Sequence, residues 1–93
     1  MGEEFRHNPE ASRFEAWIDG RHVGTAGYTL HGGVASFDHT VVDPALNGQG
    51  IAGRMVAHAM DKVRAADQWK VEPACSYIRL WLKRHPDYAD LVA

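Results

Sequence analysis

A glycine-rich segment at residues 43–53 separates two parts of the chain whose apolar residues repeat with different periods. Before it, apolar and polar residues alternate every second position, as they do along β-strands. After it, over residues 51–66, apolar residues recur every third or fourth position, as they do along one face of an α-helix. Pro44 ends strand pairing because it has no N–H to donate. The chain is therefore expected to turn from a strand into a helix here, through Gly48, Gly50 and Gly53.

The part before this junction predicts a three-stranded antiparallel meander. Residues 14–18 alternate as a strand, and Asp19-Gly20 follows at once, a dipeptide that favours a two-residue hairpin turn with two positive φ angles. A return strand is expected over 22–30, a second tight turn at 31–33 and a third strand over 34–42.

After the junction, the amphipathic helix over 51–66 leads into a short apolar strand at 70–75. Because a helix separates this strand from the previous one, the two strands should pair in parallel through a right-handed crossover. A last helix is expected over 77–84, ended by Pro86. The predicted order is β-β-β-α-β-α, an α+β (mixed α/β) fold in which helices back one mixed sheet.

A chain of 93 residues has room for one domain. We expect this domain to span residues 13–93, after a flexible lead-in over residues 1–12, which are polar and show no periodicity. The N-terminus lacks the basic and apolar stretches of a signal peptide, and no apolar run is long enough to cross a membrane, which favours a cytoplasmic protein. The single cysteine, Cys75, excludes an internal disulfide, and the dispersed histidines show no zinc-binding spacing, so no metal is expected.

The charges narrow the range of partners. Ten basic and twelve acidic side chains give a net charge of −2, which disfavours binding to nucleic acid. Residues 1–49 carry seven acidic and three basic side chains, whereas residues 50–93 carry five acidic and seven basic ones. An anionic small molecule should therefore bind in the C-terminal half. We expect neither nucleic acid nor a membrane as partner, and a monomer.

The glycine-rich segment offers a place for phosphate. Glycines let the backbone approach a ligand closely, and the free N–H groups at a helix N-terminus attract anions. A diphosphate suits this geometry. The alternative is that Gly48 and Gly50 only form a tight corner and Gly53 a close helix–sheet contact. Residues 48–53 also match the dinucleotide fingerprint G-x-G-x-x-G, with Glu72 about 20 residues further on, but the chain is too short for that fold.

The same junction carries Asn47-Gly48-Gln49-Gly50-Ile51-Ala52, which resembles the Q/R-x-x-G-x-G/A motif of the Gcn5-related N-acetyltransferase (GNAT) superfamily. More narrowly, the chain is similar to small single-domain, YjdJ-type acetyltransferase-like proteins. This similarity rests on its length and on His39-Thr40-Val41-Val42, Cys75-Ser76-Tyr77 and His85-Pro86-Asp87-Tyr88, and covers about residues 13–92. The chain departs from the superfamily in having Asn47 where Arg or Gln is usual. It also lacks the N-terminal helices and final strands that usually shape the acceptor site.

The resemblance implies a minimal GNAT-like fold with acetyl-CoA as co-substrate. The pantetheine arm of coenzyme A would enter where the last meander strand separates from the strand at Val71, and would pair with backbone near Val41 and Val42. Physically, separated strands leave N–H and C=O groups that an amide-bearing arm can satisfy. The diphosphate would lie on the loop residues Asn47, Gly48, Gln49, Gly50, Ile51, Ala52 and Gly53.

Acetyl transfer to an amine requires a neutral amine, a polarised thioester carbonyl and a proton for the departing thiolate. No glutamate lies on the last meander strand, so His39 is the candidate base, unless alternation buries it in the core beside Phe37. Cys75 is a candidate nucleophile, or else a small buried apolar residue. We hypothesise that His39 lowers the pKa of Cys75 and that the two form a reactive pair.

The predicted function is that of an acetyl-CoA-dependent N-acetyltransferase acting on an amine of a small molecule or a protein. In the superfamily a tyrosine on the last helix often protonates the thiolate. Trp81 has that place here, which leaves the role to Tyr77, Tyr88 or water. The alternative function is a coenzyme A or acyl-CoA binding module with little or no catalytic activity, favoured by Asn47, the missing glutamate and the reduced scaffold. The two functions differ in turnover, because only the acetyltransferase would release thiol from acetyl-CoA faster in the presence of an amine.

Overall fold

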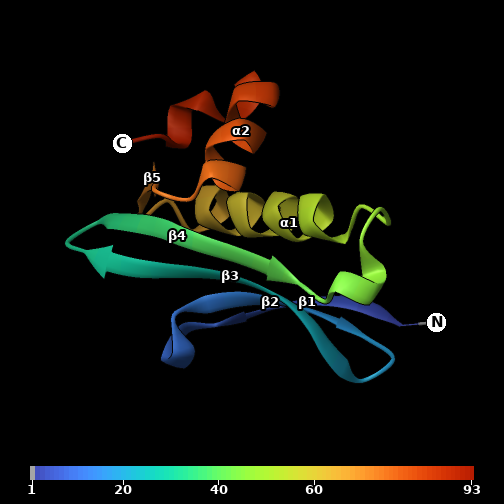
Figure 1. Ribbon diagram of the computed structural model, residues 1–93. Coiled ribbons are helices and arrows are strands. Elements are labelled where there is room, and N and C mark those ends of the chain that lie inside the picture. Colours follow the sequence, from blue (N-terminus) through green and yellow to red (C-terminus); the bar gives the residue numbers. More distant parts are fainter. Residues whose placement is uncertain (1) are drawn as a thin grey trace.

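The computed structural model describes residues 2–93 as a five-stranded sheet with both α-helices on one side of it (Figure 1). The strands follow the order β1-β2-β3-β4-β5, with the first four antiparallel and β5 parallel to β4. The strands are β1 (Glu3–Asn8), β2 (Arg13–Ile18), β3 (Arg21–His31), β4 (Val34–Val42) and β5 (Lys70–Pro73). The helices are α1 (Ile51–Ala66) and α2 (Ser76–Arg84), and 3₁₀ turns lie at Pro9–Ala11, Pro44–Leu46 and Pro86–Leu91.

The predicted mixed fold is confirmed, including its parallel crossover. Strand β4 and helix α1 begin and end where the sequence predicts. The first hairpin turns through Asp19 and Gly20, whose φ angles are 49° and 79°, as a two-residue turn of this kind requires. At the C-terminal end, β5 ends two residues earlier than expected, at Pro73, and α2 begins one residue earlier, at Ser76.

The expected flexible lead-in over residues 1–12 is corrected by the structure, apart from Met1, which lies outside the described residues. Residues 3–8 form β1, which pairs with β2 along its whole length, so the meander has four strands instead of three. The sequence hides this strand because Phe5 is its one large apolar residue. The next residue on the same side of the strand, His7, is polar and packs by ring stacking on Phe14 of β2 instead.

The core lies between α1 and the sheet, and α2 closes its end (Figure 1). Helix α1 presents an apolar face to β2, β3 and β4, and burial of such side chains is the main source of stability in a domain of this size. Among residues 2–93, no helix is long and apolar enough to cross a membrane. The largest fully buried side chains are Phe14, Phe37, Ile51, Met55, Met60, Ile78, Val56 and Val71.

The face of the sheet away from the helices carries a buried carboxylate. Glu15 is 4% exposed and accepts hydrogen bonds from Arg13 Nε (2.7 Å), Trp17 Nε1 (2.9 Å) and Asn8 Nδ2 (3.1 Å). Burial raises the pKa of Glu15, but these three donors lower it by more, to about 2. The carboxylate is therefore ionised at neutral pH and ties β1 to β2.

Candidate functional site

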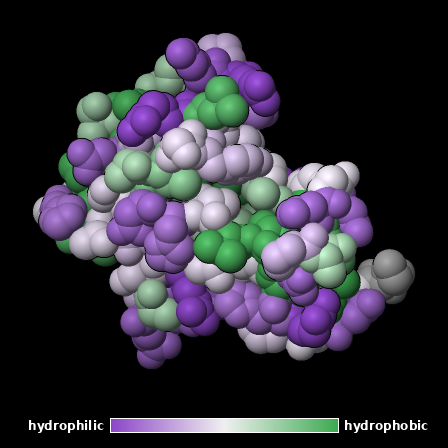
Figure 2. Space-filling view, in the orientation of Figure 1, coloured by the Kyte–Doolittle hydropathy of each residue, from purple (hydrophilic) through white to green (hydrophobic). Residues whose placement is uncertain are grey.

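Strands β4 and β5 separate beyond Phe37, as the resemblance led us to expect. Their last residue pair is Phe37 opposite Pro73, and the Cys75 N–H then donates a hydrogen bond to the Phe37 carbonyl oxygen (2.8 Å). Over residues 38–42, β4 has β3 on one side and, within the described chain, no strand on the other. Val41 is 59% exposed here, and Figure 2 shows hydrophobic surface over this end of the sheet, below α1. An extended, amide-bearing ligand could pair with this open strand edge.

The loop before α1 leaves its backbone donors free. Gly48 and Gly50 have φ angles of 83° and 76°, which glycine adopts at little cost, and Gly50 caps α1 without any side-chain hydrogen bond. The first helical hydrogen bond runs from the Arg54 N–H to the Gly50 carbonyl oxygen (3.1 Å). Within the described residues, the N–H groups of residues 48–53 have no protein acceptor. Such a group of donors at the positive end of a helix suits a phosphate or diphosphate.

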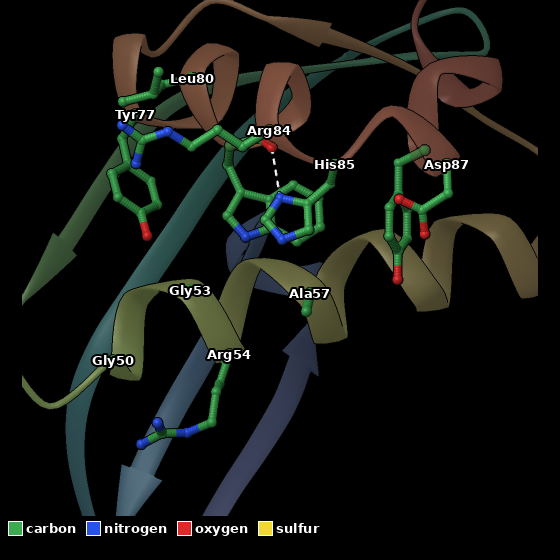
Figure 3. A pocket seen from close by; sticks show the side chains of 11 residues that line it. Gly50, Gly53, Arg54, Ala57, Tyr77, Leu80, Arg84, His85 and Asp87 are labelled. Atoms are coloured by element: carbon green, nitrogen blue, oxygen red, sulfur yellow. Dashed lines mark hydrogen bonds between the residues drawn. The ribbon is translucent and has the colours of Figure 1, made fainter.

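Two cavities adjoin this loop and share Gly50, Gly53 and Tyr77 in their walls. The smaller has a volume of about 210 Å³ and reaches from the loop to Val42. The larger, of about 540 Å³, lies between α1 and α2. In Figure 3, Tyr77 points from α2 towards the first turn of α1. Gly53 therefore lies next to Tyr77 of α2, with 3.6 Å between the Tyr77 hydroxyl and the place a Cβ would take, and does not make the close helix–sheet contact considered above.

The larger cavity has an aromatic and basic wall formed by α2 and the residues that follow it. The rings of Trp81 and His85 stack with their centres 3.9 Å apart, and His85 Nδ1 donates to the Trp81 carbonyl oxygen at 2.7 Å (Figure 3). Arg84 and Tyr88 extend this wall. Flat rings beside a guanidinium group suit a ligand with an aromatic base and a phosphate.

Cys75 lies at the opening between β4 and α2, half-buried, one residue before the first turn of α2. Its Sγ is 3.7 Å from Thr40 Oγ1. Burial raises the pKa of the thiol, but the N–H groups of Ile78 and Tyr77, together with the hydroxyl and N–H of Thr40, outweigh it. The pKa of Cys75 is therefore below its ordinary value, as expected for a thiol at a helix N-terminus.

The structure does not bring His39 to Cys75. The His39 ring lies over Gly27 and its Nδ1 is 2.7 Å from Asp38 Oδ1, whereas Thr40, the next residue along β4, is the one that contacts Cys75. Neighbouring residues of a strand point to opposite faces, so the hypothesis of a reactive pair is wrong. The alternative, a buried core histidine, is wrong as well, since the His39 side chain is 57% exposed.

A β-bulge explains this error. Phe37 pairs with Tyr28 of β3, but His39 pairs with Gly27, so Asp38 is an extra residue on β4. The extra residue reverses the alternation, and His39 lies on the face opposite to Phe37. It also lets Asp38 reach two partners, because its second carboxylate oxygen accepts a hydrogen bond from Thr29 Oγ1 (3.0 Å).

Comparison with known proteins decides the family. A family model described as GCN5-related N-acetyl-transferase matches residues 13–91. The chain belongs to this family. A solved structure of a GCN5-like protein from Staphylococcus aureus superimposes on this GNAT with a TM-score of 0.73 at 20% identity, covering 97% of this chain and 87% of the other.

A second solved structure is more distant. The ribosomal-protein-S18-alanine N-acetyltransferase from Escherichia coli gives a TM-score of 0.58 at 18% identity, and the match covers 76% of this GNAT but only 42% of that enzyme. At such identities, these two likenesses show the shared fold alone. Comparison with curated proteins gave no match.

The two candidate tyrosines of this GNAT differ in their surroundings. The Tyr88 hydroxyl donates to Asp61 Oδ1 at 2.6 Å, and this hydrogen bond, with burial, raises the pKa of Tyr88. Tyr77 has no such bond to a carboxylate in the described residues, and burial raises its pKa. Both phenols are protonated at neutral pH. Tyr77 lines both cavities beside the loop, whereas Tyr88 lines the larger one alone and is engaged with Asp61.

Three residues of the site were missed by sequence reasoning. They are Asp38, Thr40 and Arg54, of which the sequence singles out Thr40 alone, as part of the His39-Thr40-Val41-Val42 motif. Contacts between segments far apart in the chain give each its role, and a single sequence carries no direct signal of such contacts. Their partners are His39 for Asp38, Cys75 for Thr40, and Glu3 with Gln49 for Arg54.

Proposed function

We propose that this GNAT binds acetyl-CoA and transfers the acetyl group to an amine. The observation that carries the proposal is the set of free N–H groups over residues 48–53 beside the open edge of β4. The diphosphate would accept hydrogen bonds from these N–H groups, and the pantetheine arm would pair with the β4 backbone near Val41 and Val42. The family match supports a ligand of the coenzyme A type over other diphosphates.

The nucleotide half of the ligand would lie in the larger cavity. His85, whose ring is stacked on the buried Trp81, offers an aromatic ring to an adenine base, and Arg84 offers a guanidinium group to a phosphate. This end of the site lies in the half of the chain that carries the excess of basic residues.

We propose His39 as the base that accepts the amine proton. Asp38 holds the proton on Nδ1, so Nε2 of the neutral ring is free to accept another. The amine nitrogen would attack the thioester carbonyl carbon from the face of the sheet that carries no helix, and a C–N bond would form as its proton passes to His39. The C–S bond then breaks, and coenzyme A leaves as a thiolate that takes up a proton.

Cys75 supports a second order of events. Its thiolate, favoured by the start of α2, would attack the same carbonyl carbon and release coenzyme A, leaving an acetyl thioester on Cys75. An amine would then attack this thioester; the C–N bond forms, the amine proton passes to water, and the C–S bond breaks to return the Cys75 thiolate. The two orders differ in an observable species, because an acetyl adduct on Cys75 forms without amine only in the second.

A titration with coenzyme A and acetyl-CoA, followed through backbone amide NMR signals, tests the binding half of the proposal. We expect the largest shifts over residues 47–53, and unchanged signals there would end the proposal. Thiol release from acetyl-CoA with a panel of polyamines, amino acids and peptides tests the chemistry. Activity that survives in Cys75→Ala and is lost in His39→Gln assigns direct transfer.

A coenzyme A binding module is the second candidate, and the separation of His39 from Cys75 favours it. It predicts the same amide shifts, with no acceleration of thiol release by any amine and no acetyl adduct on Cys75 by mass spectrometry.

A further inference from the structure

Arg54, in the first turn of α1, joins the glycine loop to the N-terminal strand. Its Nε and Nη2 donate to the two carboxylate oxygens of Glu3 at 2.7 and 3.0 Å, and its Nη1 donates to the Gln49 carbonyl oxygen at 2.9 Å. In Figure 3 the Arg54 side chain, which is also part of the lining of the larger cavity, points away from α2. Arg54 therefore borders the cavity and at the same time ties the loop to β1.

The shape of this contact fixes where Nη1 points. A guanidinium group bound to a carboxylate through two parallel hydrogen bonds has its plane set by that carboxylate. Because Glu3 holds Nε and Nη2, the remaining nitrogen, Nη1, is directed at the loop. Nη1 lies so close over Gly50 that a Cβ there would be 2.9 Å from it. Within the described residues, this is the one side-chain hydrogen bond that reaches the loop at 47–50.

We propose that Glu3 and Arg54 form a clamp that holds the loop in the conformation that receives the diphosphate. This inference rests on the proposed function. A loop with glycines at positions 48 and 50 has a large conformational entropy, and ordering it before the ligand arrives lowers the cost of binding. Because the Glu3 carboxylate neutralises Arg54, the pair acts through position and not through added positive charge. Strand β1 thereby contributes to ligand affinity although it lies on the far edge of the sheet.

Glu3→Ala tests the clamp, and Glu4→Ala is its matched control. Glu4 lies on the same strand and also holds an arginine through two hydrogen bonds, to Arg6 at 2.9 and 3.1 Å, but it does not contact the loop. In ligand-free protein, we expect Glu3→Ala to lower the ¹⁵N order parameters of residues 48–50 and Glu4→Ala to leave them unchanged. With coenzyme A, we expect Glu3→Ala to weaken binding about tenfold by calorimetry, as for the loss of one charged hydrogen-bonded contact.

Two further measurements separate the clamp from general damage to the strand. In an Arg54→Met background, Glu3→Ala should cause no further loss of affinity, because Glu3 acts through Arg54. With S-acetylpantetheine, which lacks the diphosphate, Glu3→Ala should leave kcat/KM unchanged. Equal or tighter coenzyme A binding by Glu3→Ala would overturn the clamp while the proposed function stands. A wild type that does not bind coenzyme A would overturn the proposed function, and the order parameters would still report on the clamp.

Discussion

Thr40 and Cys75 approach one another across the opening between β4 and α2, with Oγ1 and Sγ 3.7 Å apart. The thiol can donate to the Thr40 hydroxyl, and after ionisation the hydroxyl can donate to the thiolate. Together with the N–H groups of Tyr77 and Ile78, Thr40 outweighs the effect of burial and brings the pKa of Cys75 below its ordinary value. The thiol at this opening therefore ionises more readily than an ordinary cysteine thiol.

Thr40→Val should therefore raise the pKa of Cys75. We expect the midpoint of the pH profile of iodoacetamide alkylation to move upward and the rate at pH 7 to fall several-fold, because one donor to the thiolate is lost. Thr40→Ser keeps the hydroxyl and should retain the wild-type profile. Identical profiles for Thr40→Val and wild type would show that backbone N–H groups, and not the Thr40 hydroxyl, set this pKa.

Gly50→Ala and Gly53→Ala should change the free energy of unfolding in opposite directions, although the two residues lie only three positions apart. Alanine at position 50 must adopt a φ of 76° and displace Arg54, which should cost about 1–2 kcal/mol in the free energy of unfolding and weaken coenzyme A binding at least tenfold. Alanine at position 53 lies inside α1 with 3.6 Å to the Tyr77 hydroxyl, an ordinary contact, and should stabilise the helix by roughly 0.5–1 kcal/mol. Urea denaturation and calorimetry measure both effects, and equal stabilities for the two variants would contradict the loop geometry.

The junction at residues 43–53 was predictable because local chemistry decides it. A change of hydrophobic period marks the passage from β4 to α1, and the glycines provide the two positive φ angles that the loop requires. The hairpin at Asp19-Gly20 was predictable for the same reason, since its turn type depends on two adjacent residues. In each case the deciding interactions lie within a few positions of one another.

The two errors involve interactions between distant segments. Strand β1 is held by pairing with β2 and by Phe5, His7 and Glu3, whose partners lie at positions that a single sequence does not reveal. The bulge at Asp38 depends on how β4 pairs with Gly27 of β3, so an expectation of strict alternation fails at this position. That single step changed the predicted face of His39 and created the mistaken pair with Cys75.

His39 should be moved by a substitution on the neighbouring strand. A Cβ at position 27 would lie 2.0 Å from His39 Cε1, so in Gly27→Ala the ring must rotate away from Asp38. Because the ring is exposed, we expect a stability change below about 1 kcal/mol, with a large fall in kcat if His39 is the base.

His39→Gln should lower kcat by about 100-fold, and His22→Gln, which removes another histidine of the meander, should not. Imidazole ¹⁵N signals report the displacement, and a wild-type kcat in Gly27→Ala with a displaced ring would exclude this role.

The stability of the domain should fall as the pH falls below about 6.5, because two histidines are held neutral between β1 and α1. Burial lowers the pKa of His58, and Lys62 lowers it further although Asp61 acts in the other direction; burial, His58 and Lys62 lower the pKa of His7. His7 Nε2 is 2.7 Å from the Tyr28 hydroxyl, whereas His58 Nε2 is buried and has no hydrogen-bond partner among residues 2–93. Below the ordinary histidine pKa, these two histidines bind protons in the unfolded chain but stay neutral in the folded one. The contribution to stability is therefore complete above about pH 6.5 and declines as the pH approaches the lowered pKa values of the folded protein.

His58→Phe should therefore be more stable than wild type and should lose less stability on acidification. Phenylalanine has no nitrogen that needs a hydrogen bond and does not titrate. The loss in the free energy of unfolding between pH 7 and pH 5 should therefore shrink, by roughly 0.5–1 kcal/mol because the ring is only partly buried and solvent screens its charge. His31→Phe, which replaces an exposed histidine at the turn between β3 and β4, is the matched control. Urea denaturation at a series of pH values measures both variants. Parallel curves of stability against pH for His58→Phe and wild type would mean that His58 binds its proton as readily in the folded protein as in the unfolded chain.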